Sequence, residues 1–146
     1  MIAGKIKLII DSDLSHVFLV GFSVNRICLE IPLSEVEAYQ VEVCVVEAVN
    51  NTIKHAYGNE KGHEVEVLID LDTERITFQI CDTGVAMKAG KKPSLEFDPD
   101  DRENFPEGGM GLFIMHEVMD EVSYSSSRGR NVLALTRHLV RNSSEG

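Results

Sequence analysis

The apolar positions in the N-terminal part of the chain predict a strand followed by a helix. Residues 5–10 are mostly apolar and are typical of a short opening strand. The segment 11–13 (Asp-Ser-Asp) supplies residues that cap helix N-termini, and a mostly apolar stretch runs from Leu14 to about Leu29. We therefore expect a first helix over this stretch.

A second helix is predicted by a capping signal and by helical spacing. Ser34 and Glu37 have the S-x-x-E spacing in which side chain and backbone satisfy each other's unpaired donors at a helix start. The helix should run to about Tyr57, and Gly58 should end it. At about 100° per residue, one side of this helix collects apolar residues, and three more widen the arc. The first set is Ala38, Val45, Val49, Ile53 and Ala56, and the second is Tyr39, Val43 and Val46.

The remaining patterned segments predict two antiparallel hairpins and a third helix. Apolar residues alternate over 64–71 and again over 76–80, with an Asp-Thr-Glu segment soon after the first strand. Helical spacing returns from Gly111 to about Asp120. The last hairpin is expected from segments 121–126 and 131–139, which flank Ser-Arg-Gly-Arg.

This order of elements predicts a mainly antiparallel sheet with helices covering one face. No internal repeat or second domain is visible, so residues 1–146 are expected to form one domain. Between 83 and 108 the chain shows no sustained period, and an irregular connection of this length is uncommon unless it is functional or mobile. We interpret this segment as a lid and residues 141–146 as a frayed tail.

Composition and charge narrow the classes of function. The chain has 146 residues, 43% of them hydrophobic, and no apolar run approaches the roughly 20 residues needed to cross a bilayer. A formal net charge of −10 disfavours nonspecific binding to nucleic acid or to a membrane surface. Three cysteines without a CxxC pair are expected to be reduced and mostly buried, and the cytoplasm is the expected location. A protein partner or a small ligand is favoured.

Polar residues in the second predicted helix are candidates for metal and proton chemistry. Glu47 and Asn51 lie four residues apart, so they project from one face beside the apolar side. Their oxygens suit Mg²⁺, with Asn51 as a ligand and Glu47 as the holder of a metal-bound water or as a general base. His55 could orient a phosphate or cap the helix end, and the structural role is favoured. The alternative is that Glu47 and Asn51 are merely half-exposed polar residues.

Asp82 follows a strand that should be buried, where the chain leaves the sheet. A carboxylate facing an apolar pocket can accept the exocyclic amino hydrogen of adenine, and Gly84 would let the backbone approach the ring. Guanine presents a carbonyl there, so an unpaired Asp82 would cost about 1–3 kcal/mol and favour ATP over GTP by about tenfold or more. A D-x-G turn without a ligand is the alternative.

A glycine-rich segment at 107–111 (Glu-Gly-Gly-Met-Gly) directly precedes a predicted helix. Its glycines can expose backbone N–H groups at a positive helix end, which suits phosphate. The segment is neither a P-loop nor a Rossmann fingerprint, because Gly-Lys-Ser/Thr and G-x-G-x-x-G are both missing. A plain loop is the alternative.

In combination, these elements are specific. E-A-V-N-N-T-I-K-H-A-Y (47–57), D-T-G (82–84) and G-G-M-G-L-F-I-M (108–115) stand in one order. This order resembles the N, G1 and G2 boxes of the GHKL ATPase superfamily. The short chain, the His-Ala-Tyr after the N box and the segment 113–122 are similar to the bacterial anti-sigma factor serine kinases within it. The resemblance covers about residues 5–140.

The resemblance implies a Bergerat-type α/β two-layer sandwich with a mainly antiparallel mixed sheet and an ATP lid. It implies transfer of the γ-phosphate of ATP, with Mg²⁺, to a serine of a STAS-domain anti-anti-sigma partner. Glu47 would be the general base, Asn51 the Mg²⁺ ligand and Asp82 the adenine reader. Sequestration and release of a sigma factor or an equivalent regulator, and a homodimer, are also implied. The remaining nucleotide-site residues would be Gly84, Gly108, Gly109, Met110, Gly111 and Leu112.

The chain departs from the family pattern in three places. Relatives often carry threonine after the glycine of the last hairpin, where it assists adenine, whereas Arg130 and Asn131 stand here, and Asn131 is the candidate substitute. Glu107 occupies a place where some relatives carry an arginine that contacts partner and phosphate. The stretch after Gly84 lacks the second glycine that is frequent in G1 boxes.

The leading hypothesis is an ATP-dependent protein serine kinase that also sequesters a regulatory partner. A catalytically weak nucleotide-binding module that acts only by sequestration is the alternative. The presence of Glu47 and Asn51 favours the kinase, because a degenerate relative is free to lose them. A detached histidine-kinase ATPase domain is a third reading, disfavoured because no dimerisation helix pair with a phosphoacceptor histidine precedes the pocket.

Overall fold

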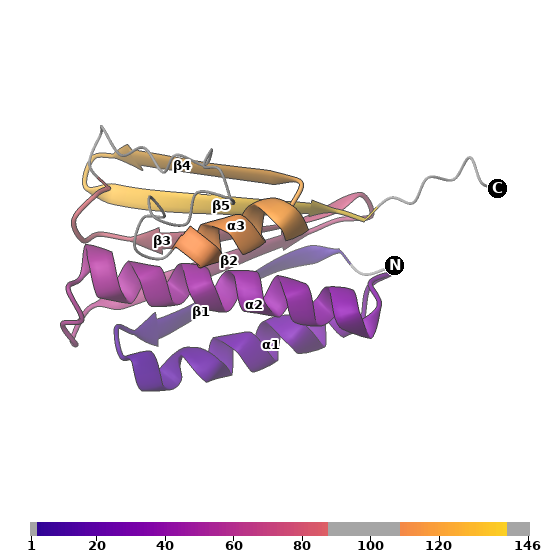
Figure 1. Cartoon of the computed structure of the whole chain (residues 1–146), viewed down its shortest axis with the longest axis horizontal. Coiled ribbons are helices and arrows are strands. Elements are labelled where there is room, and N and C mark those ends of the chain that lie inside the picture. The colour runs from indigo at the N-terminus through magenta and orange to yellow at the C-terminus, as the bar shows by residue number, and fades with distance from the viewer. Residues whose placement is uncertain (1–2, 88–108, 140–146) are drawn as a thin grey trace.

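In the described part of the chain, five strands form one antiparallel sheet, and three helices cover one of its faces (Figure 1). The computed structural model describes residues 3–87 and 109–139. The strand order is β1-β2-β3-β5-β4. The strands are β1 (Gly4–Asp11), β2 (Glu64–Leu71), β3 (Arg75–Asp82), β4 (Glu121–Ser127) and β5 (Arg130–His138). The helices are α1 (Val17–Leu29), preceded by a 3₁₀ turn at Leu14–His16, α2 (Glu35–Asn51), continued by a π-helix at Thr52–Ala56, and α3 (Gly109–Val118).

The expected α/β two-layer fold is confirmed, and each pairing among the described strands is antiparallel. Several element boundaries differ from the prediction by a few residues, and one helix changes its winding. The third helix begins at Gly109, two residues before the expected start. The second helix reaches its expected end, but its last five residues wind as a π-helix.

Local turn chemistry explains both hairpins. Between β2 and β3, the carboxylate of Asp72 accepts the N–H groups of Glu74 at 2.7 Å and Arg75 at 3.0 Å. Between β4 and β5, Arg128 and Gly129 both have positive φ, 55° and 78°. Two successive left-handed residues form the two-residue turn whose twist matches that of the flanking strands.

The start of α2 is fixed by the predicted capping box. Glu37 N–H donates to Ser34 Oγ at 3.1 Å, and Ser34 N–H donates to Glu37 Oε1 at 2.8 Å. Glu37 also pairs with Arg137 of β5 at 2.9 Å, and the Arg137 guanidinium donates to the Val118 carbonyl at the end of α3 at 2.9 Å. One arginine therefore joins the sheet to two helices.

The core lies between the helices and the sheet, and one predicted member of it is wrong. Tyr39 was expected to widen the buried arc of α2, yet it is 60% exposed. The reason is that α2 packs between two helices: Cys44 Sγ lies 3.8 Å from the Ile114 carbonyl of α3, and Val46 borders Gly21 of α1. The buried arc of α2 therefore takes in Val41, Cys44 and Ala48 beside the predicted Ala38, Val45, Val49 and Ile53.

The three cysteines, all within the described residues, are free and buried, as expected. Burial raises the pKa of Cys28 and Cys44 to about 12. Thiols with such pKa values stay protonated at neutral pH, so they act as small apolar core residues.

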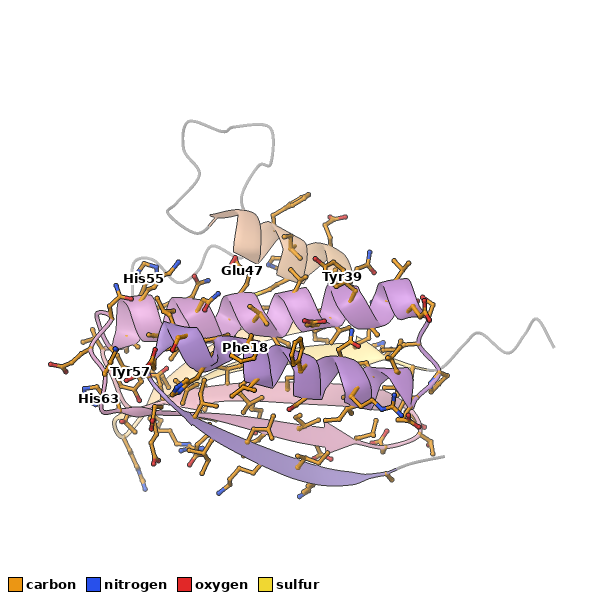
Figure 2. The ribbon with its side chains drawn as sticks, turned by 90° about the horizontal axis from the view of Figure 1, so that it is seen from below. Phe18, Tyr39, Glu47, His55, Tyr57 and His63 are labelled. Carbon is orange, nitrogen blue, oxygen red and sulfur yellow. The ribbon has the colours of Figure 1, made fainter. Side chains whose placement is uncertain are left out.

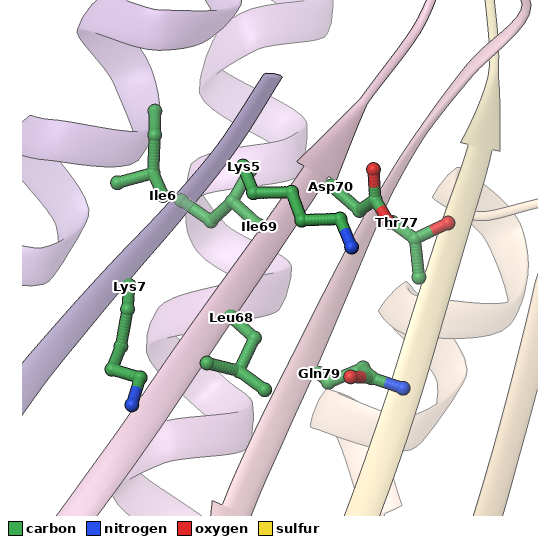
Figure 3. Close-up of a pocket in the computed structure, with 8 residues that line it drawn as sticks. All are labelled: Lys5, Ile6, Lys7, Leu68, Ile69, Asp70, Thr77 and Gln79. Carbon is green, nitrogen blue, oxygen red and sulfur yellow. The ribbon is translucent and has the colours of Figure 1, made fainter.

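The face of the sheet opposite the helices is open. A shallow cavity of about 410 Å³ lies on it over β1, β2 and β3, and Figure 3 shows the helices behind these strands. The cavity is lined by Lys5, Ile6, Lys7, Leu68, Ile69, Asp70, Thr77 and Gln79. The lining is partly charged, and none of these residues is a predicted site residue. None of the helices in residues 3–87 and 109–139 combines the length and apolar character needed to span a membrane.

Candidate nucleotide site

The helix α2 carries both the predicted general base, Glu47, and the predicted Mg²⁺ ligand, Asn51. Glu47 and Asn51 are both half-buried, and Figure 2 shows Glu47 on the side of α2 toward α3. Neither side chain has a hydrogen-bond partner within the described residues, so both leave oxygen atoms available. No group of three or more acidic, His or Cys side chains that could hold a metal occurs in the same part of the chain. A bound Mg²⁺ would therefore rely on Asn51, water and phosphate oxygens, which is a donor set that Mg²⁺ accepts.

The π-helix changes what the end of this helix can contact. The Tyr57 N–H reaches back five residues to the Thr52 carbonyl at 3.3 Å. The Ala56 carbonyl accepts the N–H of Val85, which lies just beyond β3, at 2.9 Å. His55 is exposed on the same turn, and Figure 2 shows it at the end of the helix. The end of the N-box helix is thus bonded directly to the segment that follows Asp82.

Tyr57 forms the second part of this connection. Its ring is buried and stacks on the ring of His63 at a centroid distance of 4.6 Å. Figure 2 labels both residues at the same end of the molecule. Its hydroxyl donates to the Glu64 carbonyl at 2.7 Å and accepts the N–H of Thr83 at 3.0 Å. One phenol therefore joins the helix end, the start of β2 and the end of β3.

Gly84 has a structural reason to lack a side chain, beside the predicted approach of a ligand. An added Cβ would lie 2.3 Å from the Ala56 carbonyl oxygen and 2.7 Å from its carbon, which is closer than a real Cβ approaches backbone. The sequence argument assigned this glycine to close approach of an adenine ring. In the structure, the missing side chain is what lets the strand end pack against the helix end.

Asp82 has one oxygen fixed and one available. The side chain is 7% exposed, and its Oδ1 accepts the Gly84 N–H at 2.9 Å and Asn131 Nδ2 at 2.7 Å. Its Oδ2 has no partner within the described residues. Because no buried side-chain nitrogen or oxygen in this part of the chain lacks a partner, Oδ2 still reaches solvent. The site therefore offers one free carboxylate oxygen as a hydrogen-bond acceptor.

Arg130 and Asn131, which depart from the family pattern in the last hairpin, are neighbours on β5 and lie on opposite faces of the sheet. Arg130 pairs with Glu66 at 3.1 Å, and both line a shallow cavity of about 320 Å³. Asn131, the next residue, is 1% exposed and bonds to Asp82. Asn131 therefore bonds to the predicted adenine reader, whereas Arg130 bonds to Glu66 and shares with Asp82 the lining of this cavity.

The glycine-rich part of the site is only partly described. Gly108 and Glu107 lie outside the described residues, as does the predicted lid beyond its first five residues. Backbone at Gly109, Met110, Gly111 and Leu112 forms the first turn of α3, which packs against α2. The helix that these residues open packs against the helix that carries Glu47. The phosphate-binding role of residues 108–112 stays a prediction.

Sequence reasoning missed two supporting residues. Tyr57 was noted as the expected end of the second helix and as part of the His-Ala-Tyr motif, and no role in the site was assigned to it. Ser126, whose hydroxyl donates to Asn131 Oδ1 at 2.7 Å, was not singled out. The motif was a usable signal for Tyr57, whereas the contact of Ser126 depends on the register of the last hairpin.

Replacing Tyr57 with phenylalanine should weaken ATP binding by about tenfold while the protein stays folded. The change removes only the hydroxyl, which leaves the Thr83 N–H and the Glu64 carbonyl without their partner. Isothermal titration calorimetry with MgATP measures the affinity. His63→Leu, which removes the stacked ring but keeps the hydroxyl bonds, is the control and should bind ATP more nearly as the wild type does. Equal affinities of Tyr57→Phe and wild type would contradict the role of this hydroxyl.

Together, these contacts describe an antiparallel α/β sandwich of the ATP-binding GHKL class, in which three separate chain segments meet at one end of the sheet. The chain belongs to the histidine kinase-like ATPase domain family, whose sequence model matches residues 10–137.

Comparisons with individual proteins agree with this assignment. The chain is 26% identical over 145 residues to the serine-protein kinase RsbW of Bacillus velezensis, covering 92% of this chain and 85% of that protein. It is 24% identical over 148 residues to RsbW of Bacillus subtilis, covering 94% and 87%. Among solved structures, the SiaB–SiaC complex from Pseudomonas aeruginosa contains a chain with a TM-score of 0.57 and 16% identity, covering 90% of this chain and 89% of that one. Within its family, the chain is RsbW-like.

Proposed function

We propose that this protein is an ATP-dependent protein serine kinase of a partner-switching system. Its substrate would be a serine of a STAS-domain anti-anti-sigma protein, and its second partner a sigma factor or an equivalent regulator that it sequesters in the cytoplasm. The observation that carries the proposal is the bonding of the Asp82 segment to the end of the helix that presents Glu47 and Asn51. The serine-protein kinase relatives support the reaction type.

Each site residue has a role in this reaction. Asp82 Oδ2 would accept the amino hydrogen of adenine, and the backbone N–H groups of residues 108–112 would bind phosphate. Asn51 would hold Mg²⁺, which supplies positive charge to the phosphates. Glu47 would take the proton of the serine hydroxyl while the serine oxygen forms a bond to the γ-phosphorus. The bond between that phosphorus and the β–γ bridging oxygen would break, which releases ADP. We assign His55 to the rim of the phosphate site.

A transfer assay tests the proposal. The full chain is incubated with γ-labelled ATP, Mg²⁺ and a candidate STAS-domain protein, and with the same partner carrying alanine at its acceptor serine. Acid-stable label on the first partner only is the expected result. ATP binding without any transfer would instead favour a module that acts by sequestration alone, and acid-labile label would indicate a phosphohistidine.

We also propose that two copies associate through α1. Its exposed surface is apolar, with Phe18 54%, Leu19 51% and Phe22 65% exposed. Arg26 is the one charged residue within α1, and it pairs with Glu30 at 2.9 Å. In a chain with a net charge of −10, such a face lets two copies meet with little like-charge repulsion.

Phe22→Ser should therefore shift the protein toward the monomer. Multi-angle light scattering measures the mass of the wild type, expected at twice 16.2 kDa, and of the variant. Gln79→Ser, on the opposite face of the sheet, is the control and should leave the mass unchanged. A monomeric wild type would refute the dimer without bearing on the kinase reaction.

A further inference from the structure

Asn131 is placed opposite Asp82 by the register of the sheet. The two residues pair across β3 and β5, and both side chains are buried. Asn131 Nδ2 donates to Asp82 Oδ1 at 2.7 Å and to the Gly84 carbonyl at 3.1 Å. An amide nitrogen has two donors, so both are used within the protein.

The orientation of this amide is fixed by its surroundings. Turning it over would put Oδ1 of Asn131 against a carboxylate oxygen and a carbonyl oxygen, which are both acceptors. In the observed orientation, Oδ1 accepts the hydroxyl of Ser126 at 2.7 Å. Ser126, Asn131 and Asp82 therefore form a chain of hydrogen bonds that ends on one oxygen of the carboxylate.

This chain determines which carboxylate oxygen remains for a ligand. Oδ1 of Asp82 receives two N–H donors, from Asn131 and Gly84, and Oδ2 receives none within the described residues. Two donors on one oxygen hold the plane of the carboxylate in one orientation. Asn131 has no N–H group left for a ligand, so any effect on nucleotide must pass through Asp82.

We propose that Asn131 is a positioning residue that makes the site selective for adenine by holding Asp82 Oδ2 toward the base. The inference rests on the proposed function, because it requires that the site bind ATP. A rigid acceptor favours the amino group of adenine and leaves the carbonyl of guanine facing a carboxylate oxygen. A carboxylate free to turn would lose this discrimination, since it could rotate away from guanine.

The test compares ATP and GTP affinity, measured with Mg²⁺ by isothermal titration calorimetry. The wild type should prefer ATP by about tenfold or more, and Asn131→Ala should bind ATP about tenfold more weakly with little change for GTP. Its ATP/GTP preference should therefore fall to about one. Thermal melts confirm that the variant is folded.

Thr136→Val is the matched control. Thr136 lies on the same strand, is 7% exposed, and bonds through its hydroxyl to Thr77 of β3 at 3.1 Å. It bridges the same pair of strands, five residues away from Asn131. If both polar pairs are purely structural, Asn131→Ala and Thr136→Val should each lose stability and keep the ATP/GTP preference. Our proposal predicts that Thr136→Val keeps this preference and that Asn131→Ala loses it.

Asn131→Asp provides a second readout that does not depend on loss of the side chain. It sets a carboxyl group against Asp82, and like charge raises the pKa of such a pair. A proton shared between the two carboxyl groups should keep the bond to Asp82 at low pH, and its loss as the pH rises should make the two groups repel. ATP affinity of Asn131→Asp should therefore fall as pH rises from about 5.5 to about 8.5, whereas wild-type affinity should not follow this fall.

The outcomes separate the two proposals. A wild type that binds neither nucleotide refutes the proposed function, and this inference falls with it. A wild type that prefers ATP, with folded Asn131→Ala showing the same preference, overturns the inference alone and leaves the kinase proposal standing. An Asn131→Asp variant whose ATP affinity does not vary with pH would also count against it.

Discussion

Replacing Glu47 with glutamine is expected to slow phosphate transfer to the partner serine by about 10²–10⁴-fold. Glutamine keeps the size of the side chain and its place on α2, but it cannot take the proton of the attacking hydroxyl. ATP affinity should stay within about twofold of wild type, because adenine and phosphate contacts come from other segments. Single-turnover transfer of labelled phosphate gives the rate, and calorimetry gives the affinity.

Glu42→Gln is a control on the same helix. Glu42 is also half-buried, but it lies against Gly21 of α1 and away from the nucleotide site. The same loss of one negative charge should leave transfer unchanged there. If Glu47→Gln transferred phosphate at the wild-type rate, another group would have to be the base.

Adding a single methyl group at Gly84 should damage both stability and nucleotide binding. The new Cβ would meet the Ala56 carbonyl at 2.3 Å, and backbone at a helix end cannot move aside as a flexible side chain can. Relief requires breaking the bond from Val85 to Ala56, which would displace the adjacent Asp82. We expect a loss of about 3 kcal/mol in the free energy of unfolding and ATP affinity more than tenfold weaker.

Denaturant unfolding and calorimetry measure the two effects. Thr83→Ala, one residue earlier, is the comparison: its side chain is exposed, and its backbone N–H bond to Tyr57 is retained. It should unfold and bind ATP nearly as the wild type does. A Gly84→Ala variant with unchanged stability would show that the strand end can shift away from the helix at little cost.

Local signals predicted most of the fold. The alternation in β2 and β3 and the Ser34–Glu37 capping box each act within a few residues, and the structure confirms them. The predicted burial of Tyr39 was wrong. Apolar periodicity identifies the buried side of a helix, but it does not say how much of that side the neighbouring helices cover. Whether a flank of α2 is covered depends on where α1 and α3 lie, and no local pattern encodes that.

The candidate site shows the same division. Residue types and spacing singled out Asp82 and Asn131, but only strand register reveals that they bond to each other. Gly84 was singled out as a residue that needs to lack a side chain, and the structure agrees. The group that a side chain would contact, the Ala56 carbonyl, lies 28 positions earlier in the chain. The assignments of Glu47, Asn51 and His55 remain predictions.

The π-helical winding at Thr52–Ala56 fixes the number of residues at this helix end, which is not usual for a helix terminus. A π turn arises when one extra residue is accommodated in a helix. Deleting a residue there would replace the π turn by ordinary α winding and change how the helix end presents its last carbonyl and the residue that follows it. Tyr57 would swing away from Thr83, and Ala56 from Val85. Insertions and deletions that most helix termini absorb would here uncouple the helix from the strand end.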